Sequence, residues 1–94
     1  MAGFLYILQC SDGSYYTGST TNLDLRLAQH EAGEASSYTA CRLPVKAMYA
    51  CEFPSYFDAF QRERQVKKWS RKKKEALIRD DFDALVRFSK SKRS

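Results

Sequence analysis

The segment YYTGSTTNLDLRLAQH, residues 15–30, has the pattern of a strand that turns directly into a helix. Aromatic and β-branched residues favour the strand, and the polar residues 19–22 offer side-chain oxygens that cap a helix. We expect that helix to run from about Leu23 to Ala32. It ends at Gly33, because glycine readily adopts the left-handed conformation of a helix C-terminus.

An arginine and a histidine lie on the apolar face of this helix, where the residues at positions i, i+3, i+4 and i+7 are Leu23, Arg26, Leu27 and His30. An unpaired buried charge is costly, so Arg26 needs an anionic partner. Glu63 lies at the edge of the apolar stripe of a second predicted helix, and a buried Arg26–Glu63 ion pair is one interpretation. The other is a site in which a carboxylate binds a divalent metal, an arginine binds a phosphate, and a tyrosine or histidine moves a proton. Such a set suggests phosphodiester hydrolysis.

The hairpin before this helix determines whether two tyrosines can act together. Residues 4–10 are predicted to form the preceding strand. A two-residue loop would place Tyr6 and Tyr16 on opposite faces of the sheet, because side chains alternate along a strand. A three-residue loop over 11–13, with its glycine left-handed, places Leu8 opposite Tyr16 and brings both tyrosines to one face. We predict the three-residue loop, since a joint role requires it.

The remaining chain predicts a loop over 34–43, a strand over 44–53, and helices over about 56–70, 71–78 and 82–88. The helix over 71–78 is either separate or a bent continuation of the one before it. The order ββαβααα is that of a small α/β domain of the α+β type, with an antiparallel hairpin at one side of its sheet. We expect one domain over 1–88 and a basic, frayed tail over 89–94.

Positive charge is concentrated in the last third of the chain. Residues 62–94 carry thirteen basic and five acidic side chains, whereas residues 1–61 carry three basic and six acidic ones. This asymmetry favours nucleic acid as partner, with an anionic membrane surface second, although a solvated basic helix fits the charge equally well. The predicted phosphate contacts, which would be salt-sensitive and sequence-tolerant, are Arg42, Arg64, Lys67, Lys68 and Arg71. Trp69 is expected to anchor the core rather than to stack on a base.

The three cysteines are odd in number and form no CxxC pair, and no basic region precedes the first apolar run. We therefore expect a soluble cytoplasmic protein without disulfides or a signal peptide, and no membrane partner. A zinc site built from the cysteines and His30 matches no common ligand spacing, so buried structural thiols are the expected role.

Four segments, in their order and spacing, resemble the GIY-YIG nuclease superfamily, in particular its small stand-alone, single-domain members. They are FLYIL with Tyr6, YTG with Tyr16 and Gly18, LDLRLAQHEAG with Arg26 and His30, and FQRERQVKKW with Glu63. The resemblance runs from about residue 4 to residue 79. It implies a three-stranded antiparallel sheet flanked by helices and one divalent ion, Mg²⁺ or Mn²⁺, in each site.

The resemblance also implies a role for each residue. Glu63 would be the only protein ligand of the metal, and Arg26 would contact the scissile phosphate. Tyr6 would be the general base for the attacking water, with His30 accepting a hydrogen bond from its hydroxyl. Tyr16 would hold metal-bound water or the phosphate region.

Two departures from the family pattern stand out. Thr17 replaces the isoleucine of the second motif, and no asparagine follows the glutamate at the expected distance, where Lys74 and Glu75 occur. Most characterised nucleases of the superfamily carry a separate DNA-recognition domain; we expect none here, so sequence-specific cutting would need a protein partner.

Our leading hypothesis is a metal-dependent endonuclease-like domain that hydrolyses phosphodiester bonds in structured or damaged DNA, rather than RNA, with little sequence specificity. It would serve DNA repair or recombination. One alternative is a catalytically weak or inactive nucleic-acid-binding module of the same fold. A third hypothesis is an interaction subunit whose basic tail docks an acidic protein.

Overall fold

The computed structural model describes residues 1–79, which form three strands and four helices. In chain order these are β1 (Gly3–Gln9), β2 (Tyr15–Thr20), α1 (Leu23–Glu31), α2 (Ser37–Ala40), β3 (Lys46–Phe53), α3 (Tyr56–Lys67) and α4 (Arg71–Ile78). Within residues 1–79, no helix has the length and apolar character needed to cross a bilayer. The predicted helix over 82–88 and the predicted tail over 89–94 lie outside the described residues.

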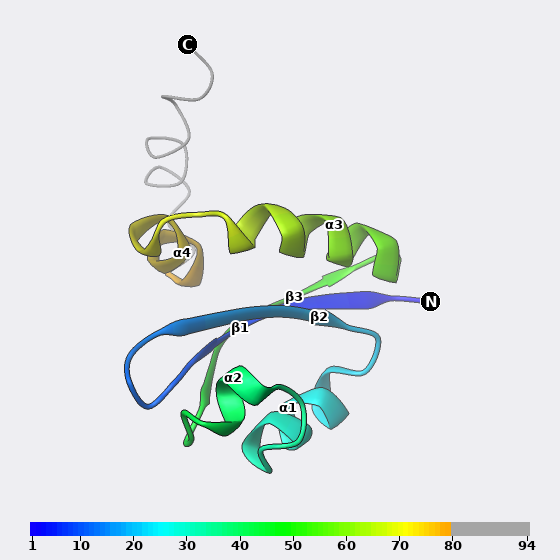
Figure 1. Ribbon diagram of the computed structural model, residues 1–94. Coiled ribbons are helices and arrows are strands. Elements are labelled where there is room, and N and C mark those ends of the chain that lie inside the picture. The colour runs from blue at the N-terminus through cyan, green and yellow to red at the C-terminus, as the bar shows by residue number, and fades with distance from the viewer. Residues whose placement is uncertain (80–94) are drawn as a thin grey trace.

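The strands form one antiparallel sheet in the order β2-β1-β3, with helices on both faces (Figure 1). On one face, Leu5 and Ile7 of β1 pack against Val66 of α3 and Leu77 of α4. On the other face, Tyr6 of β1 points toward α1 and α2. β1 is the central strand and is covered on both sides, so it carries the apolar core, whereas β2 is an edge strand.

The hairpin has the predicted three-residue loop. Leu8 lies opposite Tyr16 in the ladder, and the Cys10 amide donates to the Ser14 carbonyl oxygen at 2.8 Å. Gly13 has a φ of 85°, a conformation that glycine adopts without strain. The rings of Tyr6 and Tyr16 therefore share one face of the sheet, with their centroids 6.5 Å apart.

Capping side chains place the predicted helix starts. The Asn22 side chain accepts from the Leu25 amide at the start of α1, and Ser55 accepts from the Asp58 amide at the start of α3. Gly33 follows the end of α1 with a φ of 77°, as predicted. These boundaries depend on local hydrogen bonds, which explains why the sequence identifies them.

Three boundaries differ from the prediction. The loop over 34–43 contains α2, so the observed order is ββααβαα. The sequence does not predict this helix, because four residues are too few to show helical periodicity and the Ser36 cap is the only local signal. The helix over 56–70 ends at Lys67, because Ser70 caps a new helix by accepting from the Lys73 amide. The segment 71–78 is thus a separate helix, and β3 begins two residues after Pro44.

Thr17 carries a buried hydroxyl for which residues 1–79 provide no hydrogen-bond partner. Replacing it with valine keeps the shape and removes the unsatisfied group, so we expect the free energy of unfolding to rise by about 1 kcal/mol. Thr20 on the same strand is the control, because its hydroxyl accepts from the Asn22 amide at 3.1 Å. Thr20→Val should lower stability in the same chemical denaturation experiment. A destabilised Thr17→Val protein would contradict this account.

Candidate active site

A chain of buried polar groups joins β1, α1 and α2. The Tyr6 hydroxyl lies 2.8 Å from His30 Nε2, and His30 Nδ1 lies 2.9 Å from Thr39 Oγ1. Thr39 Oγ1 in turn lies 3.2 Å from the Ser36 carbonyl oxygen. Tyr6, His30 and Thr39 are each at most 1% exposed, so these groups satisfy one another in the absence of bulk water.

The direction of this chain follows from its ends. The Ser36 carbonyl can only accept, so Thr39 donates to it and accepts from His30 Nδ1–H. His30 Nε2 is then unprotonated and accepts a hydrogen bond from the Tyr6 hydroxyl. The positive charge of Arg26 acts on the same hydroxyl, where it partly offsets the rise in the pKa of Tyr6. This arrangement satisfies more groups than the reverse one, which would leave the Tyr6 proton unused.

Thr39 is therefore expected to set the tautomer of His30. Wild-type protein should carry the imidazole proton on Nδ1, and Thr39→Val, which removes the acceptor, should move it to Nε2. The chain has one histidine, so the two imidazole ¹⁵N signals of an NMR spectrum report on it without ambiguity. Thr39→Ser keeps the hydroxyl and should preserve the wild-type tautomer. A wild-type ring protonated on Nε2 would refute the assignment.

Gly18 allows the phenol of Tyr6 to reach the edge of the sheet. Gly18 lies opposite Tyr6 in the ladder, and a Cβ atom at this position would lie 2.5 Å from Tyr6 Cζ. No side chain fits there, so the Tyr6 phenol extends across β2 above the bare backbone of Gly18. Tertiary packing therefore requires the glycine of the YTG segment, whereas the strand conformation by itself would accept any residue there.

Glu63 lies on the opposite face of the sheet, within α3. Its side chain is almost buried, and one carboxylate oxygen accepts from Ser19 Oγ at 2.5 Å. The other oxygen lies 2.8 Å from Lys67 Nζ. The interpretation of a buried Arg26–Glu63 ion pair is therefore wrong within the described chain, since the ion pair of Glu63 is made with Lys67.

The two halves of the site meet at β2. Ser19 follows Gly18, so Glu63 approaches the strand at the residue next to the one that Tyr6 crosses. Burial, followed by the neighbouring Tyr16, raises the pKa of Tyr6 to about 12; Arg26 opposes this shift and Glu63 adds to it. The charges of Arg26 and Glu63 therefore both influence the pKa of the Tyr6 hydroxyl.

His30 is kept neutral by its surroundings. Burial, and then the positive charge of Arg26, lowers the pKa of His30 below its ordinary value of 6.5. The ring also lies 5.1 Å from that of Tyr16, between centroids. A neutral ring with a free lone pair on Nε2 can take a proton, so His30 suits the role of an acceptor behind Tyr6.

The donor set around Glu63 fits a loosely held magnesium-type ion. No cluster of three or more His, Cys, Asp or Glu side chains occurs within residues 1–79, which excludes a closed protein cage there. A single carboxylate is nevertheless sufficient for Mg²⁺, which keeps several waters and takes further oxygens from substrate phosphates. Lys67 already pairs with the Glu63 carboxylate at 2.8 Å, so a metal ion at this position would have to displace the ammonium.

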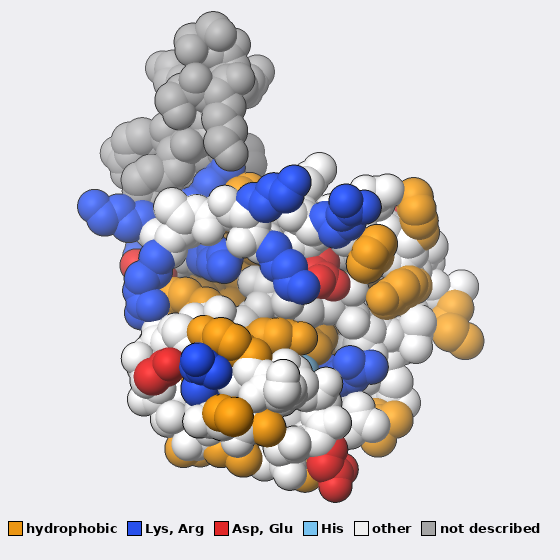
Figure 2. Space-filling model, viewed as in Figure 1, with side chains coloured by type: hydrophobic (Ala, Val, Ile, Leu, Met, Phe, Trp, Pro, Cys, Tyr) orange, Lys and Arg blue, Asp and Glu red, His pale blue; other side chains and the backbone are white. Residues whose placement is uncertain are grey.

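The five predicted phosphate contacts differ in their surroundings. Arg64 on α3 and Lys68 at the C-cap of α3 are exposed, and Figure 2 shows Lys and Arg side chains spread along this helix. Lys67 is paired with Glu63, next to the site. Arg42 pairs with Asp12 at 3.0 Å and lies over the Tyr38 ring.

Arg71 belongs to α4 rather than to a continued α3, which corrects its expected placement. Its guanidinium donates to the Gly13 carbonyl oxygen at 2.7 Å and pairs with Glu75. Glu75 also accepts from the Tyr15 hydroxyl at 3.2 Å. These contacts join α4 to the hairpin. Burial, and then the positive charge of Lys67, lowers the pKa of Lys74.

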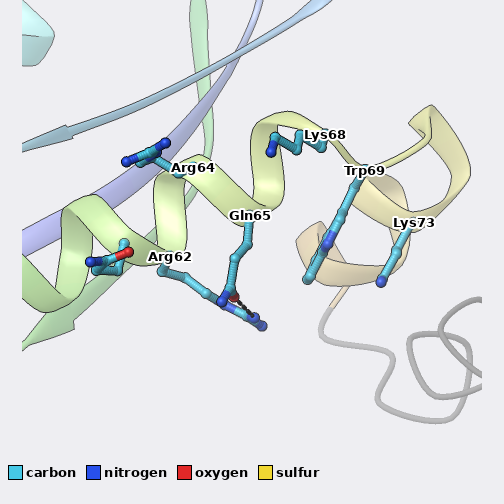
Figure 3. Close-up of a pocket in the computed structure, with 7 residues that line it drawn as sticks. Arg62, Arg64, Gln65, Lys68, Trp69 and Lys73 are labelled. Carbon is cyan, nitrogen blue, oxygen red and sulfur yellow. Dashed lines mark hydrogen bonds between the residues drawn. The ribbon is translucent and has the colours of Figure 1, made fainter. Parts of the chain in front are cut away.

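Trp69 lines an open cavity of about 430 Å³ on α3 and α4 (Figure 3). Its ring packs against the core, with Arg62 and Lys73 within 4.8 Å and 4.1 Å of the ring centroid. The expectation of a core anchor agrees with this packing. Arg62 projects from a different side of α3 than Glu63 and Lys67, neither of which lines the cavity, so this cavity is not part of the candidate active site.

Two contributing residues were not predicted from the sequence. Thr39 lies in the segment expected to be a loop, and the sequence identifies Ser19 only as a possible helix cap. Serine and threonine are common in loops and caps, so neither position carried a distinctive signal. The pairing of His30 with Thr39, and of Glu63 with Ser19, depends on contacts between distant segments.

Comparison with known proteins gives consistent matches. A family model described as "GIY-YIG catalytic domain" matches residues 2–76. The UPF0213 protein of Natronomonas pharaonis is 45% identical over 78 residues, which cover 83% of this chain and 92% of that protein. The solution NMR structure of the UPF0213 protein BH0048 from Bacillus halodurans has a TM-score of 0.57 at 42% identity and covers 86% of each chain. That of the protein EF2693 from E. faecalis has a TM-score of 0.58 at 34% identity and covers 85% of each chain.

Proposed function

The chain belongs to the GIY-YIG family, whose domain is a nuclease-type catalytic domain, and we propose that it is a divalent-metal-dependent endonuclease. Its substrate is DNA rather than RNA, cut with little sequence specificity, and its role lies in DNA repair or recombination. One observation carries the proposal. The Tyr6–His30 pair and the Glu63 carboxylate approach the edge strand β2 from opposite faces, at the adjacent residues Gly18 and Ser19.

The proton path begins at Tyr6. A phenol with a pKa of about 12 is a poor base if it must first become a phenolate. Because Tyr6 donates to His30 Nε2, it can accept a proton from the attacking water while its own proton passes to His30. His30 then becomes an imidazolium that still donates from Nδ1 to Thr39. The phenol stays neutral, and the raised pKa of Tyr6 is no obstacle.

The remaining residues position and stabilise the phosphate. Glu63 would hold the divalent ion, which supplies Lewis-acid stabilisation of the charge that develops on phosphate oxygens. Arg26, next to the Tyr6 hydroxyl, contacts the scissile phosphate and stabilises the same negative charge. Tyr16 is half-buried beside Tyr6 and His30, and holds the water or phosphate region.

A nicking assay on supercoiled and branched DNA tests this proposal. We expect wild-type protein to cut with millimolar Mg²⁺ or Mn²⁺ and to lose activity with a chelator. Arg26→Ala should lose activity, whereas Arg79→Ala, which removes an arginine from the end of α4, should retain it. Cutting that persists in chelator would refute the metal dependence, and cutting that survives in Arg26→Ala would refute the phosphate contact assigned to Arg26.

A second candidate is a binding module that keeps the fold without useful catalysis. The Lys67 ammonium on Glu63 favours it, because a metal ion must compete with that charge. The absence of an asparagine at the position of Lys74 and Glu75 favours it as well. This alternative predicts salt-dependent DNA binding with no product under any metal condition.

The three free cysteines fit a reducing compartment, and we assign the protein to the cytoplasm on that basis. Sequence specificity, where it is needed, would come from a protein partner.

A further inference from the structure

Three aromatic side chains are exposed on the first two turns of α3. Tyr56 is 40% exposed, Phe57 64% and Phe60 37%, and we call these residues the aromatic platform. Figure 2 shows the corresponding hydrophobic side chains gathered at the end of α3 that lies on the right. None of the three belongs to the core cluster, which includes Val66 further along the same helix. A contiguous exposed patch of this kind marks an interaction site.

The platform begins at the candidate active site. The Tyr56 hydroxyl lies 3.5 Å from Ser19 Oγ, and the same Ser19 oxygen donates to Glu63. The Tyr56 and Phe60 rings stack with centroids 6.1 Å apart, so the row continues from this point along α3. A group that rests on these rings is therefore adjacent to whatever binds at Glu63.

Positively charged side chains follow the aromatic platform along α3. The Arg64 guanidinium lies 5.9 Å from the Phe60 ring centroid, and Lys67 and Lys68 follow one turn later. Asp58 is the acidic residue of this turn, but it precedes Phe60 by two positions and so projects from another side of the helix. Flat rings followed by cations are complementary to a ligand that alternates flat groups with anions.

A single-stranded nucleic acid has that composition. Each unpaired base offers a π-face to an aromatic ring, and each phosphate pairs with a lysine or arginine. A base inside a duplex is already stacked on both faces and cannot use the platform. We propose that Tyr56, Phe57 and Phe60 stack unpaired bases of the DNA strand whose phosphate lies at Glu63. This inference rests on the proposed function and narrows its substrate to DNA with a single-stranded segment, such as a flap or a gap, next to the cleaved bond.

The test compares ligands that differ only in their bases. Fluorescence anisotropy in chelator measures binding without cleavage, with three probes: an oligothymidylate of about twelve nucleotides, an abasic strand of equal length and a blunt duplex. The Phe57→Leu/Phe60→Leu protein keeps apolar side chains and helix propensity but lacks the aromatic faces. We expect its affinity for oligothymidylate to fall about tenfold, with abasic and duplex affinities unchanged. Leu25→Ala, which alters an exposed apolar side chain on α1, is the control and should bind like wild type.

Three outcomes would overturn the inference. Wild-type protein could fail to bind oligothymidylate, or the double variant could lose as much affinity for the abasic strand as for oligothymidylate. The third outcome is a wild-type protein that is oligomeric and a double variant that is monomeric, which would make the platform an interface between copies of the chain. The single variant Phe57→Leu, at the most exposed position, should show part of the effect even if the double variant folds poorly. The test is separable from the nuclease proposal. Base-dependent binding by wild type without any cleavage supports the platform and refutes the nuclease proposal. Equal cleavage of duplex DNA by wild type and the double variant, without base-dependent binding, supports the nuclease proposal and refutes the platform.

Discussion

Glu63→Gln is expected to reduce DNA cleavage by at least about a thousandfold, because it removes the negative charge that holds the divalent ion while keeping the shape of the side chain. The amide oxygen can still accept from Ser19, so the contact between α3 and β2 is preserved. Only the ion pair with Lys67 is lost, and the lysine side chain is half-exposed to solvent. A partly exposed pair of this spacing contributes less than about 1 kcal/mol, so the fold should remain intact.

Two measurements separate this effect from unfolding. Chemical denaturation should show a stability close to that of the wild type, and Mn²⁺ titration followed by water proton relaxation should show weakened metal binding. The control is Glu52→Gln, which neutralises an exposed carboxylate on β3 and should cut at the wild-type rate. Activity of Glu63→Gln within about tenfold of the wild type would exclude this residue as the metal ligand.

Tyr6→Phe is expected to reduce cleavage by about a hundredfold or more, since the general base is removed. The ring remains, so packing across Gly18 is retained, but the hydroxyl that donates to His30 is lost. Tyr16→Phe is the matched comparison on the same face of the sheet. Its loss should be smaller, because Tyr16 lies outside the hydrogen-bonded path from Tyr6 to Thr39.

The pH dependence tests how the proton moves. The pKa of His30 is lowered below its ordinary 6.5, so the ring is neutral at pH 7 and takes up a proton only as the pH falls below 6.5. A protonated ring cannot accept from Tyr6, so the cleavage rate should fall with decreasing pH in that range and stay level above pH 7. A rate that instead rises about tenfold per pH unit toward the Tyr6 pKa of about 12 would indicate a phenolate base and refute the relay through His30.

The same titration affects stability. The unfolded chain binds this proton at a higher pH than the folded chain does, so the free energy of unfolding also decreases as the pH falls through 6.5. Rates are therefore to be compared only where denaturation curves show folded protein. His30→Gln should remove this part of the pH dependence of stability, which provides a check on the assignment.

Much of the fold could be predicted because its signals are local. Strand alternation leaves two hairpin registers open, and the joint role of Tyr6 and Tyr16 selects the one with a three-residue loop and a left-handed Gly13, which the structure has. The spacing of Arg26 and His30 placed both on the inner face of α1, where His30 is fully buried. Alternation and helical periodicity depend on neighbours in the chain, so they can be seen without knowledge of the packing.

The contacts that complete the site could not be predicted in this way. Glu63 pairs with Lys67 and Ser19 instead of Arg26, and Thr39, in a segment predicted to be a loop, hydrogen-bonds His30. The two halves of the site lie on opposite faces of the sheet and meet at β2 because that strand is at the edge and because Gly18 has no side chain. Each of these features depends on the distance between segments far apart in the chain, which is set by helix packing against the sheet and not by the local pattern of residues.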